Sequence, residues 1–255
     1  MNISLSLFNT IVVAWILLAL VLLPVLLVFS APYGRHVRGG WGPRISNRLG
    51  WMAMEIVSPA VFAALFLGGP SHKSLPMWIF FALWIAHYIH RSLIFPFITR
   101  TRGKTIPVFV VGSGIFFNLV NAGLNGFYLG WLSPTYPFAW MTDIRFVAGA
   151  ALFVAGAAIN LSADYSLIAL RGNGQTADYS IPRGKLFARV SCPNHLGEIV
   201  EWSGYALMCW NMAALSFAVW TAANLIPRAL AHHAWYRRRF VDYPPERRAV
   251  VPHLL

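Results

Sequence analysis

The chain has 255 residues, of which 58% are hydrophobic and 11% are charged, and its formal net charge is +12. Soluble domains average about 25% charged residues, and the mean hydropathy of this chain is +0.59, so a soluble helical protein with a large core is hard to reconcile with the composition. Several apolar runs approach or exceed the ~20 residues that a helix needs to cross a bilayer. The sequence therefore predicts an all-α integral membrane protein.

The first apolar run, residues 8–30, is predicted to be a retained membrane span rather than a cleaved signal peptide. No Lys or Arg precedes it, and it is longer than the apolar part of a typical signal. Further apolar segments follow at residues 51–69, 76–98, 106–131, 145–170 and 186–230. Because we find no repeat, low-complexity tail or soluble domain, residues 1–255 are interpreted as a single transmembrane domain.

The basic residues gather in alternate connections between these segments. The connections after the first, third and fifth segments and the C-terminal tail are rich in Lys and Arg, whereas the others hold little beyond Lys73 and Arg145. The positive-inside rule then predicts an outside N-terminus and a cytoplasmic C-terminus. Residues 186–230 must then cross twice or re-enter the membrane from the same side, and two crossings, which give seven transmembrane helices, are the interpretation adopted. The basic face would also suit a phosphate-rich ligand.

Polar side chains occur inside the apolar segments, where a charged residue at the centre of a membrane helix costs about 2.5–3.5 kcal/mol. In the fourth and fifth segments they recur along one helical face. Segments two to five contain Glu55, His87, Tyr88, His90, Arg91, Asn118, Asn121, Asn125, Asn160, Asp164 and Arg171. Together they predict a polar cavity that is enclosed by helices and opens to the cytoplasm.

Each of these residues also has a purely structural interpretation. The asparagines could form hydrogen bonds between helices, and Arg91 could extend its side chain to the membrane surface. The pair of His87 and His90 has no second pair with matching spacing, so no metal site is expected. Glu55 has no basic neighbour within two helical turns, and its partner is expected on the third segment, where Tyr88 or a histidine is a candidate.

The stretch at residues 181–202 reads IPRGKLFARVSCPNHLGEIVEW. It begins as a basic, polar loop and continues into one of the most apolar parts of the chain. If this part is helical, Glu198 and Glu201 share a face, with Asn194 and Tyr205 near the same stripe. Carboxylates in apolar surroundings need partners, so the stretch raises the question of what these two side chains hold.

This stretch resembles the C-terminal signature of the steroid 5α-reductase family, which reads approximately Y-x-I-P-x-G-x-L-F-x-x-V-S-x-x-N-x-x-G-E-I-x-E-W-x-G-Y-A. The tail HHAWYRRRFVDYPPERRAVVP, the HYIHR of the third segment and the N-x-x-L-N-G-F-Y-L form of the fourth resemble the family as well. The resemblance covers nearly the whole chain beyond residue 40, and the signature for cofactor binding occupies about residues 160–255.

The resemblance implies a seven-helix membrane reductase that uses NADPH to saturate the Δ4 double bond of a 3-oxosteroid. No G-x-G-x-x-G follows a predicted strand, so a Rossmann site is not expected, and the family places the dinucleotide among its helices. Glu201 would support this site or pair with a tail arginine. By similarity, the cofactor-binding residues are Asn160, Asp164, Arg171, Tyr179, Asn194, Glu198, Arg228, Tyr236 and Arg247.

The resemblance also implies that Glu55 and Tyr88 hold the carbonyl oxygen of the substrate. Negative charge develops on this oxygen when hydride reaches C5, and a donor aimed at such an oxygen lowers the barrier by ~2.7–4 kcal/mol. Tyr88 is a phenol donor, while Glu55 can donate only when protonated. The sequence does not identify the donor of the C4 proton. Met54 and Asn125 stand where some family members have Gln, which leaves the substrate less defined than the reaction.

Other functions stay open at this point. A reductase of another lipid enone, such as an enoyl thioester or a polyprenol, would use the same cofactor residues. A membrane methyltransferase that binds S-adenosylmethionine would need an Arg-His-Pro motif, where this chain reads SCPNHLGE. A lipid binder without activity would not need both the polar face of Asp164 and Arg171 and the stripe that contains Glu198. The expected partners are membrane lipids and a lipid substrate, without nucleic acid or metal, in a bacterial inner membrane or the endoplasmic reticulum.

Overall fold

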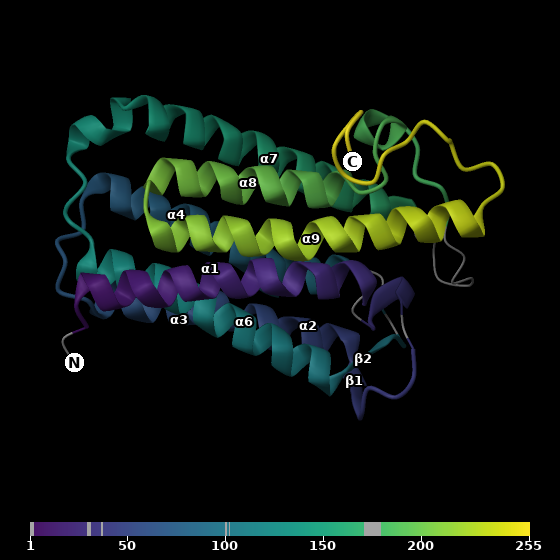
Figure 1. The fold of residues 1–255 in the computed structure, drawn as a ribbon, viewed down its shortest axis with the longest axis horizontal. Helices are drawn as coiled ribbons and strands as arrows, with labels where there is room; N and C mark the ends of the chain where they lie inside the picture. Colours follow the sequence, from purple (N-terminus) through teal and green to yellow (C-terminus); the bar gives the residue numbers. More distant parts are fainter. Residues whose placement is uncertain (1–2, 30–31, 37, 100, 102, 171–179) are drawn as a thin grey trace. The chain divides into compact units, whose positions relative to one another are not determined.

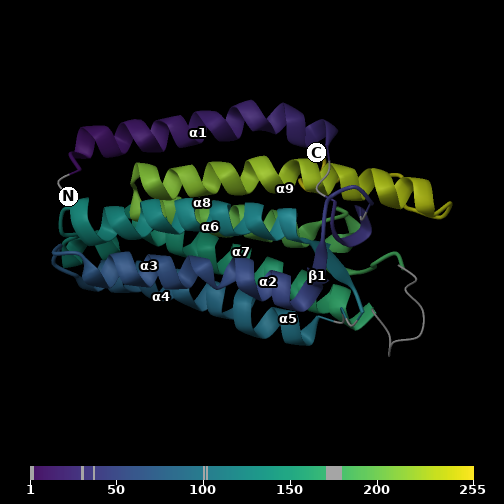
Figure 2. The same ribbon diagram turned by 90° about the horizontal axis from the view of Figure 1, so that it is seen from below.

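The computed structural model describes residues 3–29, 32–36, 38–99, 101, 103–170 and 180–255, and these are mostly helical (Figures 1 and 2). They divide into two compact units. Unit 1 comprises Met1–Val12 and Ala31–Phe146, and unit 2 comprises Val13–Ser30 and Val147–Leu255. The interpretation of the chain as one transmembrane domain stays a prediction.

Unit 1 is built around the contact of two helices, α3 (Val57–Gly68) and α6 (Val108–Phe127). Gly126 and Gly130 make this contact close, because a Cβ atom at either position would overlap the backbone of α3. The unit also contains α2 (Asn47–Glu55), α4 (Leu75–Ile89) and the short α5 (Phe95–Ile98). π-helical turns at His90–Ile94 and Tyr128–Leu132 follow α4 and α6.

The segment that the sequence predicts as one helix from residue 51 is divided in the structure. α2 ends at Glu55, Ile56 forms a turn, and α3 begins at Val57. Pro59 has no N–H group, so the carbonyl of Glu55 lacks the donor that a continuous helix would provide four residues later. Glu55 therefore lies at a break between two helices rather than inside one.

An aromatic cluster fastens α4 to α3. The rings of Phe62 and Trp84 stack with centroids 4.7 Å apart, and Phe66 stacks on Phe81 at 4.9 Å. The indole N–H of Trp84 donates to the hydroxyl of Ser58 at 3.2 Å, as a buried indole requires. These contacts hold α4 against α3 and fix which side of α4 faces α3.

A small antiparallel ribbon of β1 (Arg44–Ser46) and β2 (Thr105–Pro107) joins the two basic connections of unit 1. Ile45 pairs with Ile106, which is fully buried, and the guanidinium of Arg44 donates to the hydroxyl of Thr105 at 2.8 Å. The all-α prediction omitted these strands, because three-residue strands within a polar connection produce no recognisable alternation of apolar residues.

Unit 2 contains most of α1 (Leu5–Val28) and the helices α7 (Ile144–Leu170), α8 (Pro193–Cys209) and α9 (Met212–Arg239). The stretch predicted to cross twice forms α8 and α9, which lie side by side (Figures 1 and 2). Trp210 adopts a left-handed conformation with φ 48°, and the Asn211 side chain caps α9 by accepting from the Ala214 N–H at 2.9 Å.

The C-terminal tail folds back onto the segment that precedes α8 (Figure 1). Val190 and Arg248 form a parallel bridge, and the N–H of Cys192 donates to the carbonyl of Ala249 at 3.0 Å. A buried cluster of Cys192, Ala229, Ala249 and Val250 lies beneath. Packing and backbone hydrogen bonds thus hold the tail as part of unit 2.

Among the described residues, six helical segments are long and apolar enough to cross a membrane. Many apolar side chains on them point outward, including Val21, Phe109 and Val154, each more than 60% exposed. Such surfaces are unfavourable in water, so the protein is a membrane protein. These six segments are Leu5–Val28, Asn47–Gly68, Leu75–Ile98, Val108–Leu132, Ile144–Leu170 and Met212–Arg239.

Candidate functional site

Glycines bring the backbones of α7 and α8 into direct contact in unit 2. Gly149 and Gly156 lie seven residues apart on α7, and Gly197 and Gly204 lie seven apart on α8. A Cβ atom at any of the four would overlap the backbone of the opposite helix. Small residues permit such close approach between membrane helices. Short polar side chains on the two helices can therefore reach each other.

A polar cluster continues this contact at the end of α7 and the start of α8. The Asn160 amide donates to the backbone carbonyl of Asn194 at 2.9 Å and lies 3.5 Å from a carboxylate oxygen of Glu198. The Asn194 amide donates to the carboxylate of Asp164 at 3.0 Å. Asn160 and Asp164 are buried, and Asn194 and Glu198 are half-buried. The structure therefore brings together four residues that the sequence singled out.

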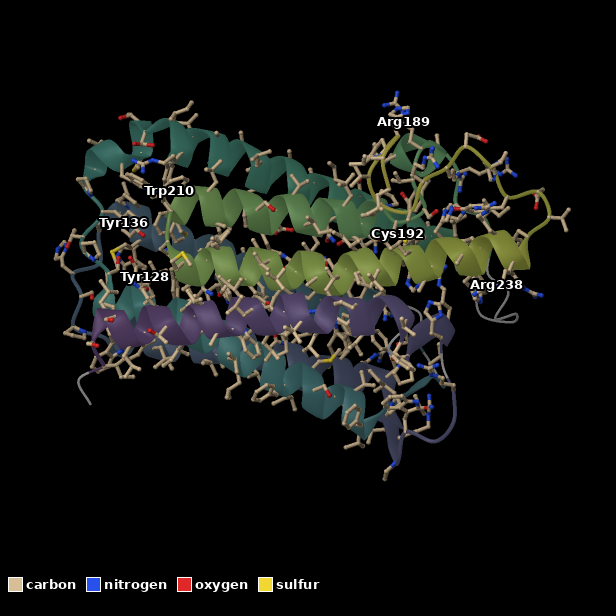
Figure 3. All side chains as sticks on the ribbon, in the orientation of Figure 1. Tyr128, Tyr136, Arg189, Cys192, Trp210 and Arg238 are labelled. Carbon is tan, nitrogen blue, oxygen red and sulfur yellow. The ribbon has the colours of Figure 1, made fainter. Side chains whose placement is uncertain are left out.

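Glu201 is buried in α8, one turn beyond Glu198, and its backbone faces Gly156 of α7. Arg228 is half-buried on α9. Arg171 and Tyr179, which the sequence also suggests for this site, lie outside the described residues. Figure 3 shows Cys192 at the start of α8 and Trp210 at its other end, so the polar cluster occupies the end of α8 that is near the tail.

Arg247 from the tail is buried next to two tyrosines. Tyr236 of α9 stacks on Tyr243 with centroids 5.3 Å apart and an interplanar angle of 8°, and the Arg247 guanidinium carbon lies 5.2 Å from the ring centroid of Tyr243. Arg247 is 3% exposed, yet its Nε and Nη1 atoms have no hydrogen-bond partner in the described part of the chain. A buried guanidinium favours an acceptor, so Arg247 offers donors for an anionic group.

Ser191, His233 and Tyr243 form a hydrogen-bonded group that sequence reasoning missed. The Ser191 hydroxyl oxygen lies 2.6 Å from Nδ1 of His233 and 2.6 Å from the hydroxyl oxygen of Tyr243. It is also 3.0 Å from the carbonyl of Arg248, to which it can donate. The group joins α9, the tail and the segment before α8, and it therefore holds Arg247 beside the tyrosines. Ser191 belongs to the family signature, which was the available signal.

A second polar group lies in unit 1, where Tyr88 is buried on α4. Its hydroxyl is 3.5 Å from Oδ1 of Asn118 on α6, and the Asn118 amide donates to the carbonyl of Met54 at 2.7 Å. Met54 immediately precedes Glu55, which is half-buried. Asn118 therefore connects Tyr88 to the helix break that holds Glu55.

Three further polar residues of unit 1 that the sequence singled out are Asn121, Asn125 and Arg91. Asn121 and Asn125 donate to carbonyls of α6 itself, those of Phe117 at 2.8 Å and Asn121 at 3.0 Å. Arg91 lies over the rings of Trp51 and Phe95, each at 5.1 Å. Such cation–π contacts stabilise a partly desolvated guanidinium.

Within the described ranges, no three or more His, Cys, Asp or Glu side chains form a group that could hold a metal ion.

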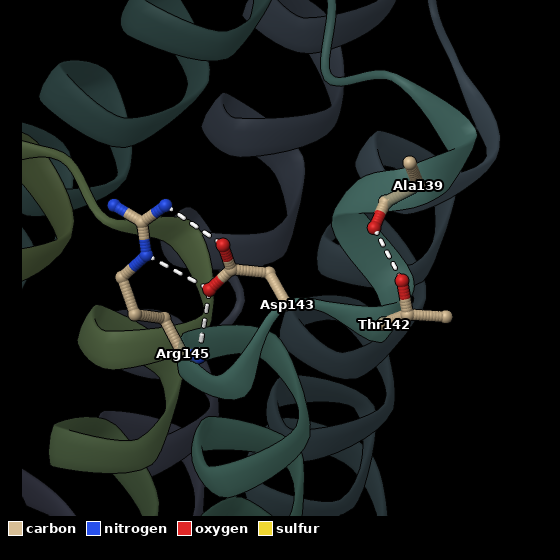
Figure 4. A network of polar contacts seen from close by, with 4 residues as sticks. All are labelled: Ala139, Thr142, Asp143 and Arg145. Carbon is tan, nitrogen blue, oxygen red and sulfur yellow. Dashed lines mark hydrogen bonds and ion pairs between the residues drawn. The ribbon is translucent and has the colours of Figure 1, made fainter.

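An ion pair lies at the start of α7, where Asp143 precedes the membrane-spanning segment Ile144–Leu170 and Arg145 is its second residue. Arg145 donates from Nη2 and Nε to the two oxygens of Asp143 at 2.8 and 2.9 Å, and its N–H donates to Asp143 at 2.8 Å (Figure 4). These side-chain and backbone hydrogen bonds from Arg145 lower the pKa of Asp143 from 3.8 to about 2. Asp143 precedes α7 and accepts from the backbone N–H of Arg145 in its first turn, in the manner of a helix cap.

Comparisons with known proteins cover nearly the whole chain. A family model described as 3-oxo-5-alpha-steroid 4-dehydrogenase matches residues 104–255. Steroid 5-alpha-reductase DET2 of Gossypium hirsutum is 39% identical over 233 residues, 88% of each chain. The 3-oxo-5-alpha-steroid 4-dehydrogenase 1 of Bos taurus is 38% identical over 248 residues, 96% of this chain and 92% of the bovine one, and that of Homo sapiens is 38% identical over 227 residues, 88% and 86%.

Proposed function

Because the chain belongs to the 3-oxo-5-alpha-steroid 4-dehydrogenase family, whose members are oxidoreductases, we propose that it uses NADPH to reduce the Δ4 double bond of a 3-oxosteroid. The proposal gives cofactor binding to the polar residues of unit 2 and substrate activation to Glu55 and Tyr88 of unit 1. The observation that carries it is the hydrogen-bonded polar cluster of Asn160, Asp164, Asn194 and Glu198, which lies inside the matched residues.

The residues of unit 2 fit a dinucleotide by their chemistry. NADPH presents hydroxyl and carboxamide groups, which suit the carboxylates and amides of the polar cluster. It also presents phosphates, which suit the Arg247 donors that have no partner among the described residues. Arg171, Tyr179, Arg228 and Tyr236 join this set by similarity to the family. When bound, NADPH supplies the hydride that C5 of the substrate accepts.

The residues of unit 1 would stabilise charge on the substrate. As hydride reaches C5, the carbonyl oxygen becomes an enolate oxygen, and Tyr88 donates its phenol hydrogen to it. Glu55, when protonated, provides a second donor. Removal of one such donor costs ~2.7–4 kcal/mol in well-studied enzymes, equivalent to roughly 10²–10³ in kcat. C4 then takes a proton from water or from an acid that we do not assign.

We further propose seven membrane crossings, with α8 as the sixth and the cofactor cavity open to the cytoplasm. α8 has 17 residues, close to the ~20 that cross a bilayer, and α9 continues it after a tight turn. The basic connections that contain Arg35, Arg44 and Lys104, together with the basic tail, would lie inside, and the connection with Asp143 outside.

The purified protein in detergent, supplied with progesterone as a Δ4-3-oxosteroid, tests the reaction. We expect steroid-dependent NADPH oxidation and a 5α-reduced product by mass spectrometry, with little activity from NADH and none with a steroid that is already saturated. Activity with an enoyl thioester or a polyprenol enone alone would keep the reaction and change the substrate. Failure to bind NADPH would contradict the proposal.

Two variants separate the proposed roles. Glu198→Ala should raise the KM for NADPH roughly 10–150-fold, because a hydrogen bond to a charged group contributes about 1.5–3 kcal/mol, with a smaller effect on steroid binding. Tyr88→Phe should lower kcat and leave the KM for NADPH unchanged. The exposed Glu246 provides the control, since Glu246→Ala removes the same carboxylate from a surface position. Equal effects of Glu198→Ala and Glu246→Ala would refute the cofactor assignment.

A further inference from the structure

Asn118 is the residue of α6 that connects two other helices of unit 1. Its Nδ2 donates to the carbonyl of Met54 at 2.7 Å, and its Oδ1 lies 3.5 Å from the Tyr88 hydroxyl. Asn118, Met54 and Tyr88 are all buried. One amide group therefore contacts both α2 and α4, in the region where Glu55 and Tyr88 are proposed to hold the substrate carbonyl.

The contact with Met54 determines which way the amide of Asn118 faces. A backbone carbonyl can only accept, so the NH₂ group must point to Met54, and the oxygen must then point to Tyr88. The phenol of Tyr88 consequently has Oδ1 of Asn118 in front of it as an acceptor for its hydrogen. This directs the Tyr88 hydroxyl without help from the substrate.

The length of the second contact leaves Tyr88 able to react. Hydrogen bonds between a hydroxyl and an oxygen are usually 2.7–2.8 Å long, and the distance from Tyr88 to Asn118 is 3.5 Å. A long hydrogen bond is weak, so the contact with Asn118 costs little free energy to give up when the hydrogen turns to a substrate oxygen. Asn118 can thus hold the hydroxyl in place and release its hydrogen.

The contact with Met54 also steadies Glu55. α2 ends at Glu55, and Pro59 cannot donate to its carbonyl, so the helix does not hold this residue from both sides. The Asn118 amide adds a hydrogen bond from another helix one residue before the break. Asn118 therefore couples the position of the Glu55 backbone to that of the Tyr88 hydroxyl.

We propose that Asn118 is a positioning residue of the reduction, which orients the Tyr88 hydroxyl and sets its position relative to Glu55. This inference rests on the proposed function of Glu55 and Tyr88. Asn121, which is also buried on α6, donates to the Phe117 carbonyl of its own helix. It provides a matched control with the same side chain in the same helix.

A double-mutant cycle with Asn118→Leu and Tyr88→Phe tests the role. We expect Asn118→Leu to lower kcat about 10-fold and to leave the KM for NADPH unchanged. In the Tyr88→Phe background it should lower kcat less than threefold, because the hydroxyl that it orients is already gone. Single-turnover reactions with the enzyme in excess, followed by mass spectrometry of the product, keep slow variants measurable.

The outcomes separate the inference from the proposed function. A 10-fold loss in both backgrounds would show that Asn118 does not act through the Tyr88 hydroxyl, and an equal loss with Asn121→Leu would show a general effect of removing a buried amide from α6; either result would overturn the inference. Unchanged kcat in Asn118→Leu would overturn it as well. If Asn118→Leu does not fold, Asn118→Thr, which is smaller and still polar, replaces it in the cycle. A wild-type protein that does not reduce the steroid at all would instead refute the proposed function.

Discussion

The Asn194 amide on α8 donates a hydrogen bond of 3.0 Å to the carboxylate of Asp164 on α7. Asp164 is buried, and Asn160 on the same helix donates to the backbone carbonyl of Asn194 at 2.9 Å. Each of the two helices therefore donates one hydrogen bond to the other, and both bonds involve Asn194. Their polar groups are arranged before any ligand binds, which reduces the cost of ordering the site on binding.

We expect Asp164→Ala to weaken NADPH binding and to destabilise the protein. It leaves the Asn194 amide without its acceptor, and an unsatisfied buried group costs about 1–3 kcal/mol. Thermal unfolding in detergent, with and without NADPH, measures both effects. Asp242→Ala is the control, because its ion pair with Arg183 is exposed at 3.4 Å and such pairs contribute about 0–1 kcal/mol. A Tm loss in Asp242→Ala as large as in Asp164→Ala would contradict this interpretation.

The contact of α7 with α8 should not tolerate a side chain at Gly156 or Gly197. A Cβ atom at Gly156 overlaps the backbone of Glu201, and one at Gly197 overlaps that of Asn160. Gly156→Ala should therefore destabilise the protein by about 1–3 kcal/mol, the usual cost of overpacking, and lower the affinity for NADPH. Gly112→Ala should be neutral or stabilising, because nothing lies within 4 Å of a Cβ there. Similar Tm values for the two variants would argue against the close contact.

Arg247 and Arg248 are neighbours with opposite environments, since Arg247 is buried and Arg248 is exposed. Arg247→Met should stabilise the protein without NADPH by about 1–3 kcal/mol, because it removes buried donors that lack a partner among the described residues. The same change should weaken NADPH binding at least 10-fold. Arg248→Met should leave both properties nearly unchanged. Thermal unfolding and NADPH titration of the two variants provide the comparison, and reduced stability of Arg247→Met without NADPH would contradict it.

The ion pair of Asp143 with Arg145 should make stability depend on pH only in acid. The pKa of Asp143 is lowered from 3.8 to about 2, so the folded state binds its proton less readily than the unfolded state. Its contribution is therefore fully present above about pH 4 and is lost as the pH falls toward 2. The Tm difference between the wild type and Asp143→Asn should shrink over this range. A difference that stays constant from pH 5 to pH 2 would exclude this linkage.

Several features of the protein could be predicted from the sequence alone. Apolar runs of sufficient length identify membrane helices whatever their neighbours are, because the bilayer thickness sets the requirement. The spacing of Asn160 and Asp164, and of Asn194 and Glu198, places each pair on one helical face, and the signature around residues 181–202 indicates the family. The family match confirms the prediction from the signature, and the six long apolar segments confirm the prediction of membrane helices, while the roles of the individual site residues stay predictions.

Only the tertiary structure decided which of these faces meet and which polar residues act across helices. Asn118, Asn121 and Asn125 are equivalent in the sequence, yet Asn118 contacts Met54 and Tyr88, whereas Asn121 donates to its own helix. The glycine contact of α7 with α8 and the bridge of Val190 with Arg248 likewise depend on partners far away in the chain. Periodicity determines the direction of a side chain relative to its own helix, but the helix opposite it is chosen by packing.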